Sequence, residues 1–236
     1  YKVNVIAHRG FSGIAPENTL SAFSKAIEAG ADMIEFDVSL SKDQEIIVIH
    51  DKTVNRTTNG KGKVSDFTIE ELKNLDAGSW FDKKFKNEKI PTLEEVLQIT
   101  KGKILLNIEI KKYSVKRFAK KGGIEEKIVL LLEKYDICDQ VIISSFNKLA
   151  IERIKKFNKN IQTAFLYRFA INKRLIKLAK KLEIYSFNQG KRFFSKKSLN
   201  ELYNSNIRLN IYTINSKKEM KKLIDFGVSG IITNYP

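Results

Sequence analysis

The feature that most constrains the fold is a regular alternation of short apolar runs with amphipathic segments of helical period. Strands separated by helices pair in parallel, because the chain must cross back before each new strand begins. Eight such strands within 236 residues favour a closed (β/α)8 barrel, the TIM barrel, over an open doubly wound sheet. The expected strands are Val3–His8, Met33–Leu40, Ile104–Ile110, Gln140–Phe146, Thr163–Tyr167, Ile184–Asn188, Leu209–Ile214 and Gly230–Thr233.

One segment interrupts this alternation after the second expected strand. Glu45–His50 has the character of a further strand, joined to Met33–Leu40 by only a few residues, so a hairpin is expected. The following stretch, Asp51–Lys89, contains a short helical pattern at Ile69–Leu75 and is too long and too structured for an ordinary βα loop. We expect it to form a small insertion on the C-terminal rim of the barrel, within a single domain that spans residues 1–236.

The net charge is strongly positive, with 43 Lys and Arg residues against 27 Asp and Glu residues, giving +16. A basic field suits nucleic acid, anionic lipid or small phosphorylated substrates. The lysines are spread along the expected helices among many Asn and Ile residues, so we interpret most of them as a compositional bias on solvated faces. We therefore expect no nucleic-acid partner, whereas contact with a membrane surface is permitted but not required.

No apolar run is long enough to cross a bilayer, and Tyr1–Val5 has the pattern of a strand and not of a secretory signal. With Cys138 as the only cysteine, no internal disulfide can form. These features favour a cytoplasmic location, although a signal or anchor removed before Tyr1 is compatible with the sequence. No helix is expected after the last strand, because the sequence stops at Pro236.

Carboxylates gather on one face of two expected strands. Strict alternation from Met33 to Val38 places Glu35 and Asp37 on the face that points into a barrel, and Glu109 shares the inner face of the next strand with Lys111. Like charges at this separation repel and lose hydration, so a cation between them is a natural compensation. Oxygen ligands favour Ca²⁺ or Mg²⁺ over Zn²⁺. The alternative is a salt-bridge network in which Lys111 and Arg9 neutralise the acids, and the carboxylates alone do not choose between the two.

The chain has only two histidines, and each ends an expected strand. His8 is followed by Arg9 and Gly10, and His50 is followed by an aspartate. A lone histidine is more often structural than catalytic, but strand ends of this kind meet at the face where barrel enzymes keep their chemistry. Imidazole can accept a proton and imidazolium can donate one, as ester hydrolysis requires. Arg9 offers a planar fork that matches phosphate oxygens, and Lys111 adds a second positive charge.

Five motifs occur in an order and at a spacing that resemble the glycerophosphodiester phosphodiesterase family. They are Ala7-His-Arg-Gly, Ala15-Pro-Glu-Asn-Thr, Glu35-Phe-Asp-Val, Val48-Ile-His-Asp and Ile108-Glu-Ile-Lys. The resemblance runs from the first strand to the last. It implies a TIM barrel with a small insertion, one divalent cation (Ca²⁺ or Mg²⁺), and hydrolysis of deacylated phospholipids. Glycerophosphocholine or glycerophosphoethanolamine would give glycerol 3-phosphate and an alcohol.

The resemblance also implies a role for each matching residue. By this resemblance, Glu35, Asp37 and Glu109 bind the metal, and His8 and His50 transfer protons. Arg9 and Lys111 contact the phosphate. Tyr212 stands where members of the family commonly have Trp, and Asn234 and Asn55 replace common aspartates; we connect these departures with pocket shape and substrate preference. Tyr212, Phe146 and Trp80 are candidate pocket-wall residues. Asn18 is expected to cap a helix over Thr19–Ala29. Glu17 is expected to have a structural role in the first turn of that helix, with the orientation of rim residues as the alternative.

Two rival functions are also compatible with the sequence. A lysophospholipase D-type enzyme, or another lipid phosphodiesterase, would use the same barrel with an acyl groove and would bind anionic vesicles through Phe193 and Phe194 with their basic neighbours. A non-catalytic basic scaffold is disfavoured, because a scaffold needs no paired acids beside paired histidines. The head-group preference, the native metal, the base among the two histidines and the oligomeric state stay open.

Overall fold

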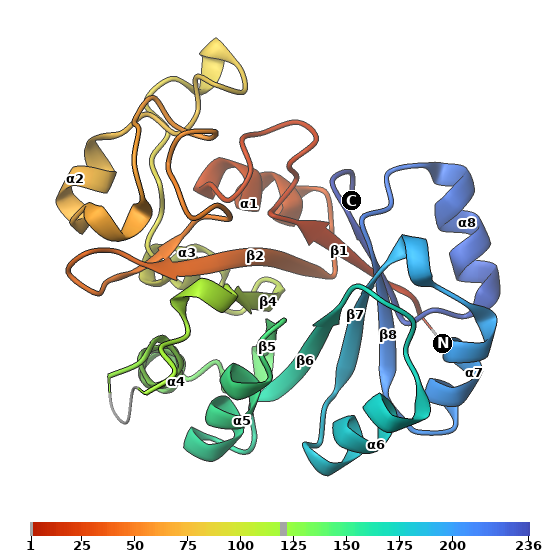
Figure 1. Cartoon of the computed structure of the whole chain (residues 1–236). Coiled ribbons are helices and arrows are strands. Elements are labelled where there is room, and N and C mark those ends of the chain that lie inside the picture. Colours follow the sequence, from red (N-terminus) through yellow and green to blue (C-terminus); the bar gives the residue numbers. More distant parts are fainter. Residues whose placement is uncertain (1, 119–121) are drawn as a thin grey trace.

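All eight expected strands form a closed parallel barrel in the computed structural model, which describes residues 2–118 and 122–236 (Figure 1). The chain closes the barrel by pairing its first strand with both the second and the last. The expected TIM barrel is confirmed. The barrel strands are β1 (Asn4–His8), β2 (Met33–Leu40), β4 (Leu105–Ile110), β5 (Val141–Ser145), β6 (Gln162–Tyr167), β7 (Ser186–Gly190), β8 (Arg208–Tyr212) and β9 (Gly230–Thr233).

Helices surround the barrel, as Figure 1 shows, and cover its outer face. On β2, Ile34, Phe36 and Val38 point outward and are fully buried, and Phe36 packs against Phe23 of the first helix with ring centroids 5.3 Å apart. The outward face was therefore predicted correctly from the alternation. The surrounding helices are α1 (Leu20–Glu28), α3 (Leu93–Thr100), α4 (Ile124–Tyr135), α5 (Lys148–Phe157), α6 (Lys173–Lys181), α7 (Lys196–Tyr203) and α8 (Lys217–Phe226).

The inner face of the barrel changes character along the strands. Toward the strand N-termini it carries a buried apolar cluster of Ile6, Met33, Ile142, Ala164 and Ile232. Most inward positions that follow along β1, β2 and β4 are polar or charged, as in His8 and Glu35, which are partners in the parallel register of β1 and β2, and in Glu109. The apolar cluster fills the barrel interior near the N-terminal ends of the strands. The polar groups therefore face the C-terminal end of the barrel, where TIM-barrel enzymes have their active sites.

The hairpin and the insertion are both present. The strand β3 (Ile46–Val48) is shorter than expected and pairs antiparallel with β2. The segment after it includes the short helix α2 (Ile69–Asn74) and encloses its own apolar cluster, in which Val54, Val64 and Leu72 are buried. In Figure 1 this segment, in orange and yellow, lies beside α1 and the end of β2. Among the described residues, no helix is long and apolar enough to cross a membrane.

Candidate active site

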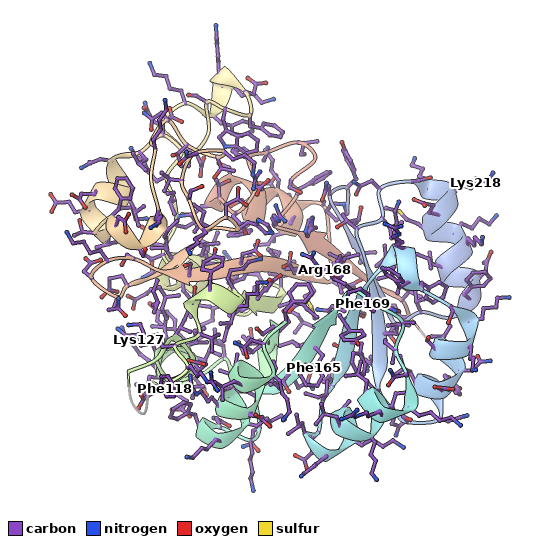
Figure 2. All side chains as sticks on the ribbon, viewed as in Figure 1. Phe118, Lys127, Phe165, Arg168, Phe169 and Lys218 are labelled. Carbon is purple, nitrogen blue, oxygen red and sulfur yellow. The ribbon has the colours of Figure 1, made fainter. Side chains whose placement is uncertain are left out.

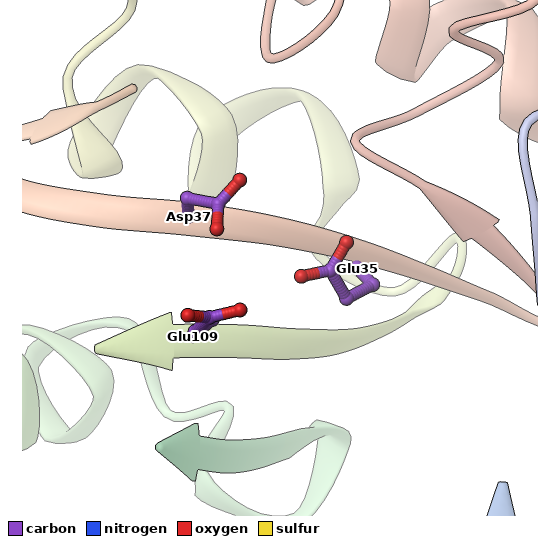
Figure 3. A group of neighbouring side chains, drawn as sticks. All are labelled: Glu35, Asp37 and Glu109. Carbon is purple, nitrogen blue, oxygen red and sulfur yellow. The ribbon is translucent and has the colours of Figure 1, made fainter. Parts of the chain in front are cut away.

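The three carboxylates predicted to face inward lie together on two neighbouring strands (Figure 3). Glu35 and Asp37 project from β2, and Glu109 projects from β4 directly opposite Asp37 in the parallel register. One oxygen from each of the three lies within 4.8 Å of the others. All three side chains are buried, so their charges have lost most of their hydration.

Burial and mutual repulsion perturb this cluster strongly. Burial, then Asp37 and Glu109, raise the pKa of Glu35 well above its ordinary value. Burial and Asp37 raise the pKa of Glu109 to about 7. Burial alone would also raise the pKa of Asp37, but Lys111 and Arg9 outweigh it and hold that pKa below its usual range. Two of the three carboxyl groups are thus poorly stabilised as anions by the chain itself.

Two cations contact the cluster but do not neutralise it. The Nζ atom of Lys111 lies 3.1 Å from Asp37 Oδ1 and 2.8 Å from Glu109 Oε1, and Arg9 Nε lies 3.4 Å from Asp37 Oδ2. The salt-bridge network weighed from the sequence is therefore present. Glu35 forms no ion pair with any described residue and accepts a hydrogen bond only from the backbone N–H of Arg9, at 3.2 Å.

The donor set fits a hard divalent cation. When all three carboxylates are ionised, they outnumber the two cations and leave one net negative charge, which would repel a phosphodiester anion. A divalent cation would stabilise the ionised forms and make the floor of the site positive. The buried acidic triad of Glu35, Asp37 and Glu109 could hold such an ion.

Both histidines lie at the same end of the barrel, and each is held through its Nδ1 atom. His8 Nδ1 is 2.7 Å from Asn234 Oδ1, and His50 Nδ1 is 2.6 Å from Asp51 Oδ1. When Nδ1 carries the proton and donates it to these oxygens, Nε2 is left to accept a proton. Burial and Arg9 lower the pKa of His8 to about 4, and burial lowers the pKa of His50, although Asp37 opposes that effect.

Asn234, one of the departures from the family pattern, contacts His8. From the sequence, Asn234 was connected with pocket shape, but in the structure its side chain positions a candidate acid–base residue. An asparagine supplies a neutral acceptor, so it orients the ring without adding a negative charge beside it.

Residues 17 and 18 lie before α1 and not within it. The N-cap of α1 is Thr19, whose hydroxyl accepts a hydrogen bond from Ala22 N, so the prediction of Asn18 as the cap was wrong. Asn18 has a positive φ of 59° and its amide instead donates to Asp37 Oδ2 at 3.0 Å. The first-turn role expected for Glu17 was also wrong, because its carboxylate pairs with Arg9 at 2.7 Å.

An ion-pair network that the sequence did not reveal connects the insertion with the barrel. Arg56 donates to both carboxylate oxygens of Glu17, at 2.9 and 2.7 Å, and its Nε lies 2.7 Å from Asp51 Oδ2. Asp51 contacts His50, and Glu17 pairs with Arg9. Because Arg56 pairs with both of these carboxylates, it helps to position His50 and Arg9. The position of Asp51 directly after His50 was the only local signal for it.

A cavity of about 460 Å³ opens over these groups. Its wall includes Phe146 and Tyr212, as expected, but not Trp80. The Trp80 indole donates to Ala77 O at 2.9 Å and packs edge-on against Phe81, inside the insertion. Of the residues predicted to bind metal or phosphate or to transfer protons, the lining contains His8, Arg9, Glu35, His50, Glu109 and Lys111. Asp37 is absent from the lining because it is 1% exposed, and it contacts Arg9 and Lys111.

Comparison with known proteins assigns the family. Residues 8–236 match the model of the glycerophosphoryl diester phosphodiesterase family. The chain belongs to this family. A glycerophosphodiester phosphodiesterase of Caldanaerobacter subterraneus subsp. tengcongensis is 42% identical over 236 residues, which cover 100% of this chain and 95% of the relative. One of Bacillus altitudinis is 38% identical, covering 98% and 94%.

A solved structure of the same architecture connects the family with a product. The phosphodiesterase of Oleispira antarctica, determined in complex with the product sn-glycerol-3-phosphate, superposes with a TM-score of 0.89. It is 31% identical, and the match covers 99% of this chain and 93% of that one. The family membership makes this chain an enzyme, a phosphoric diester hydrolase of the glycerophosphodiester phosphodiesterase type.

Proposed function

We propose that the chain hydrolyses glycerophosphodiesters in a divalent-cation-dependent reaction that releases glycerol 3-phosphate and the head-group alcohol. The observation that carries this proposal is the lining of one cavity by Arg9, Lys111, both histidines and carboxylates of the acidic triad. The product bound to the relative from Oleispira antarctica supports the same reaction.

The phosphodiester binds at the floor of the cavity. Arg9 and Lys111 contact its non-bridging oxygens, and both are already fixed by their carboxylate partners, Glu17 for Arg9 and Glu109 for Lys111. Glu35, Asp37 and Glu109 would hold a Ca²⁺ or Mg²⁺ ion, which would supply positive charge for the phosphate oxygens. Fixed positive groups of this kind stabilise the charge that develops on the phosphate oxygens.

The two histidines move the protons. One accepts a proton from the attacking hydroxyl, which belongs to water or to the neighbouring glycerol carbon, and the other donates a proton to the departing alcohol. Because Asp51 and Asn234 hold the Nδ1 atoms, Nε2 is the nitrogen that each ring offers to the substrate. Asp51 carries a charge and Asn234 does not, so a protonated ring is better stabilised at His50 than at His8. We therefore assign His50 as the acid.

The proposal is tested by initial rates on glycerophosphocholine and glycerophosphoethanolamine in Ca²⁺, Mg²⁺ or chelator. His8→Ala, His50→Ala and Glu35→Gln are each expected to lower kcat by at least about 100-fold. Glu125→Gln is the matched control, because Glu125 is a buried carboxylate paired with Arg153 in the helical layer, away from the cavity. Wild-type turnover in both histidine variants would refute the acid–base assignment.

Lysophospholipid hydrolysis is a second candidate, favoured by apolar rings at the cavity mouth. Phe193 lies in the lining with 38% of its surface exposed, and its ring is 5.5 Å from that of Phe169, which is 60% exposed. An acyl chain could cover these rings. Faster turnover of lysophosphatidylcholine than of glycerophosphocholine would favour this reading, and the reverse order would favour the deacylated substrate.

A further inference from the structure

Two arginines stand at the mouth of the cavity on neighbouring loops. Arg168 directly follows β6, and Arg192 lies just beyond β7. Both line the cavity and both are exposed (Figure 2 labels Arg168). Within the described ranges 2–118 and 122–236, neither forms an ion pair with a carboxylate. The only carboxylates in the lining, Glu35 and Glu109, belong to the proposed metal site at the floor. Among the described residues that line this cavity, no carboxylate pairs with either arginine, so the mouth is cationic.

A buried glutamine holds the two arginine-bearing loops together. Gln189 is 0% exposed, and its Nε2 donates to the carbonyl oxygen of Phe169 at 2.6 Å and to that of Phe193 at 3.2 Å. Phe169 follows Arg168 and Phe193 follows Arg192, so one side chain fixes the backbone beside both cations. Loops tied in this way present their charges in a defined arrangement, which a solvated surface lysine does not.

The same arginines occupy the aromatic surfaces near the mouth. The guanidinium carbon of Arg168 lies 5.3 Å from the ring centroid of Phe146, and that of Arg192 lies 5.8 Å from the ring centroid of Phe193. Ring faces are what a protein offers to a quaternary ammonium such as choline. Here an arginine already lies beside each of the two rings, Phe146 and Phe193. A cationic head group would therefore find these ring faces occupied and would be repelled by the two guanidinium groups.

From these contacts we propose that the cavity mouth selects phosphodiesters whose head group carries negative charge, through Arg168 and Arg192. This inference rests on the proposed hydrolysis. The attacking hydroxyl oxygen bonds to phosphorus and gives up its proton, the bond from phosphorus to the head-group oxygen breaks, and that oxygen takes a proton to leave as the alcohol. If the attacking hydroxyl belongs to glycerol, water then opens the cyclic phosphate. The glycerol half carries no ionisable group, so charge selection at the mouth acts on the head group. An anionic group there accepts hydrogen bonds from the planar guanidinium donors.

The test compares two soluble substrates that differ in head-group charge. 1,3-Bis(sn-glycero-3-phospho)glycerol places a second phosphodiester in the head group, whereas glycerophosphocholine places a quaternary ammonium there. We expect a higher kcat/KM for the anionic substrate. In Arg168→Gln/Arg192→Gln, kcat/KM for that substrate should fall about 10-fold, the order expected for the loss of two solvent-exposed ion pairs. For glycerophosphocholine it should change less than about 2-fold, and salt should weaken only the anionic preference.

The matched control is Arg208→Gln. The guanidinium of Arg208 lies 4.8 Å from the ring centroid of Tyr185, so this variant removes one positive charge and one aromatic contact, as each of the single variants Arg168→Gln and Arg192→Gln does. Arg208 begins β8, at the opposite end of the barrel from the cavity. This variant should leave the ratio of the two kcat/KM values unchanged, which separates an effect at the mouth from a change in the net charge of the protein.

The outcomes are distinct. Turnover of both substrates with a ratio that the double variant does not alter would overturn the inference and leave the proposed function standing. Turnover of neither substrate would overturn both. Sedimentation with phosphatidylglycerol vesicles is the last arm: loss of vesicle binding in the double variant, with an unchanged substrate ratio, would assign the arginines to a lipid surface and refute the selection of soluble head groups.

Discussion

Replacing Glu35 by glutamine should make the metal-free protein more stable than metal-free wild type. The same variant should gain less stability than wild type when a divalent cation is added. In the absence of a cation, Glu35 is a buried carboxyl group that faces two other carboxylates and has no ion-pair partner among the described residues. Burial and these neighbours raise its pKa well above the ordinary value of 4.5. Glutamine has nearly the same shape and can still accept the hydrogen bond from Arg9 N through its amide oxygen.

The pH dependence follows from the direction of that shift. Because the folded pKa is raised, the folded state holds the proton more tightly than the unfolded state, and stability is lost as the pH rises above 4.5 toward the raised value. The advantage of Glu35→Gln in chelator should therefore be larger near about pH 8 than near about pH 5.

Addition of a divalent cation should stabilise wild type more than Glu35→Gln. A ligand that binds only the folded state, at about 100 times its Kd, stabilises by about 2.7 kcal/mol, which for a chain of this size is a rise in Tm of about 5–10 °C. Wild type should show this rise with Ca²⁺ or Mg²⁺ by differential scanning calorimetry, and Glu35→Gln should show little of it. Glu125→Gln, which removes a buried acid of the helical layer, should retain the full rise.

Either of two results would refute this reasoning. An equal metal-induced rise in wild type and Glu35→Gln would mean that the ion binds elsewhere. A metal-free Glu35→Gln that is less stable than wild type at high pH would mean that the chain itself already stabilises the carboxylate.

Substitutions at three further positions test the surroundings of the site. Asn18→Leu removes the amide that donates to Asp37 and should weaken metal binding, measured by titration calorimetry, and cost about 1–3 kcal/mol of unfolding free energy. Gly10→Ala should lower Tm by several degrees, because φ is +80° and the added Cβ would lie 2.7 Å from Ala22 Cβ. Asn234→Ala should lower kcat about 10-fold with KM little changed, whereas Asn234→Asp should retain more activity, since it keeps an acceptor for His8.

The barrel fold could be predicted from the sequence because the pattern that indicates it, a short apolar strand followed by an amphipathic helix, is local and repeated. Each barrel strand is a short apolar run, and on β2 the alternation of inner and outer residues places Glu35 and Asp37 inward whatever the exact strand ends. The parallel register then brings Glu109 opposite Asp37. The position of the acidic triad could thus be inferred from two segments of six to eight residues.

The contacts around the triad could not be inferred in the same way. Arg56 meets Glu17 across 39 positions in the chain, and no periodicity connects an insertion with the loop before α1. Asn18 and Thr19 are both good capping residues, and the choice between them was decided by the contact of Asn18 with Asp37, which depends on the assembled barrel. Propensity describes the helix end, whereas tertiary contacts decide which residue occupies it.

Gln189 shows a further limit of sequence analysis. It lies on the barrel strand β7, and nothing in the sequence around it indicates a special role. In the folded protein its side chain donates hydrogen bonds to two backbone carbonyl groups at the cavity mouth. Trp80 shows the converse, since a large aromatic residue in a rim insertion was expected to face the substrate and instead packs within the insertion.

The most direct test of the central claim is the identity of the products formed from glycerophosphoethanolamine, followed by ³¹P NMR with and without divalent cation. The site predicts a single phosphorus product, glycerol 3-phosphate, formed with Ca²⁺ or Mg²⁺, abolished by chelator and absent with Glu35→Gln. Formation of phosphoethanolamine and glycerol, or release of glycerol 3-phosphate at an undiminished rate in chelator, would contradict the account.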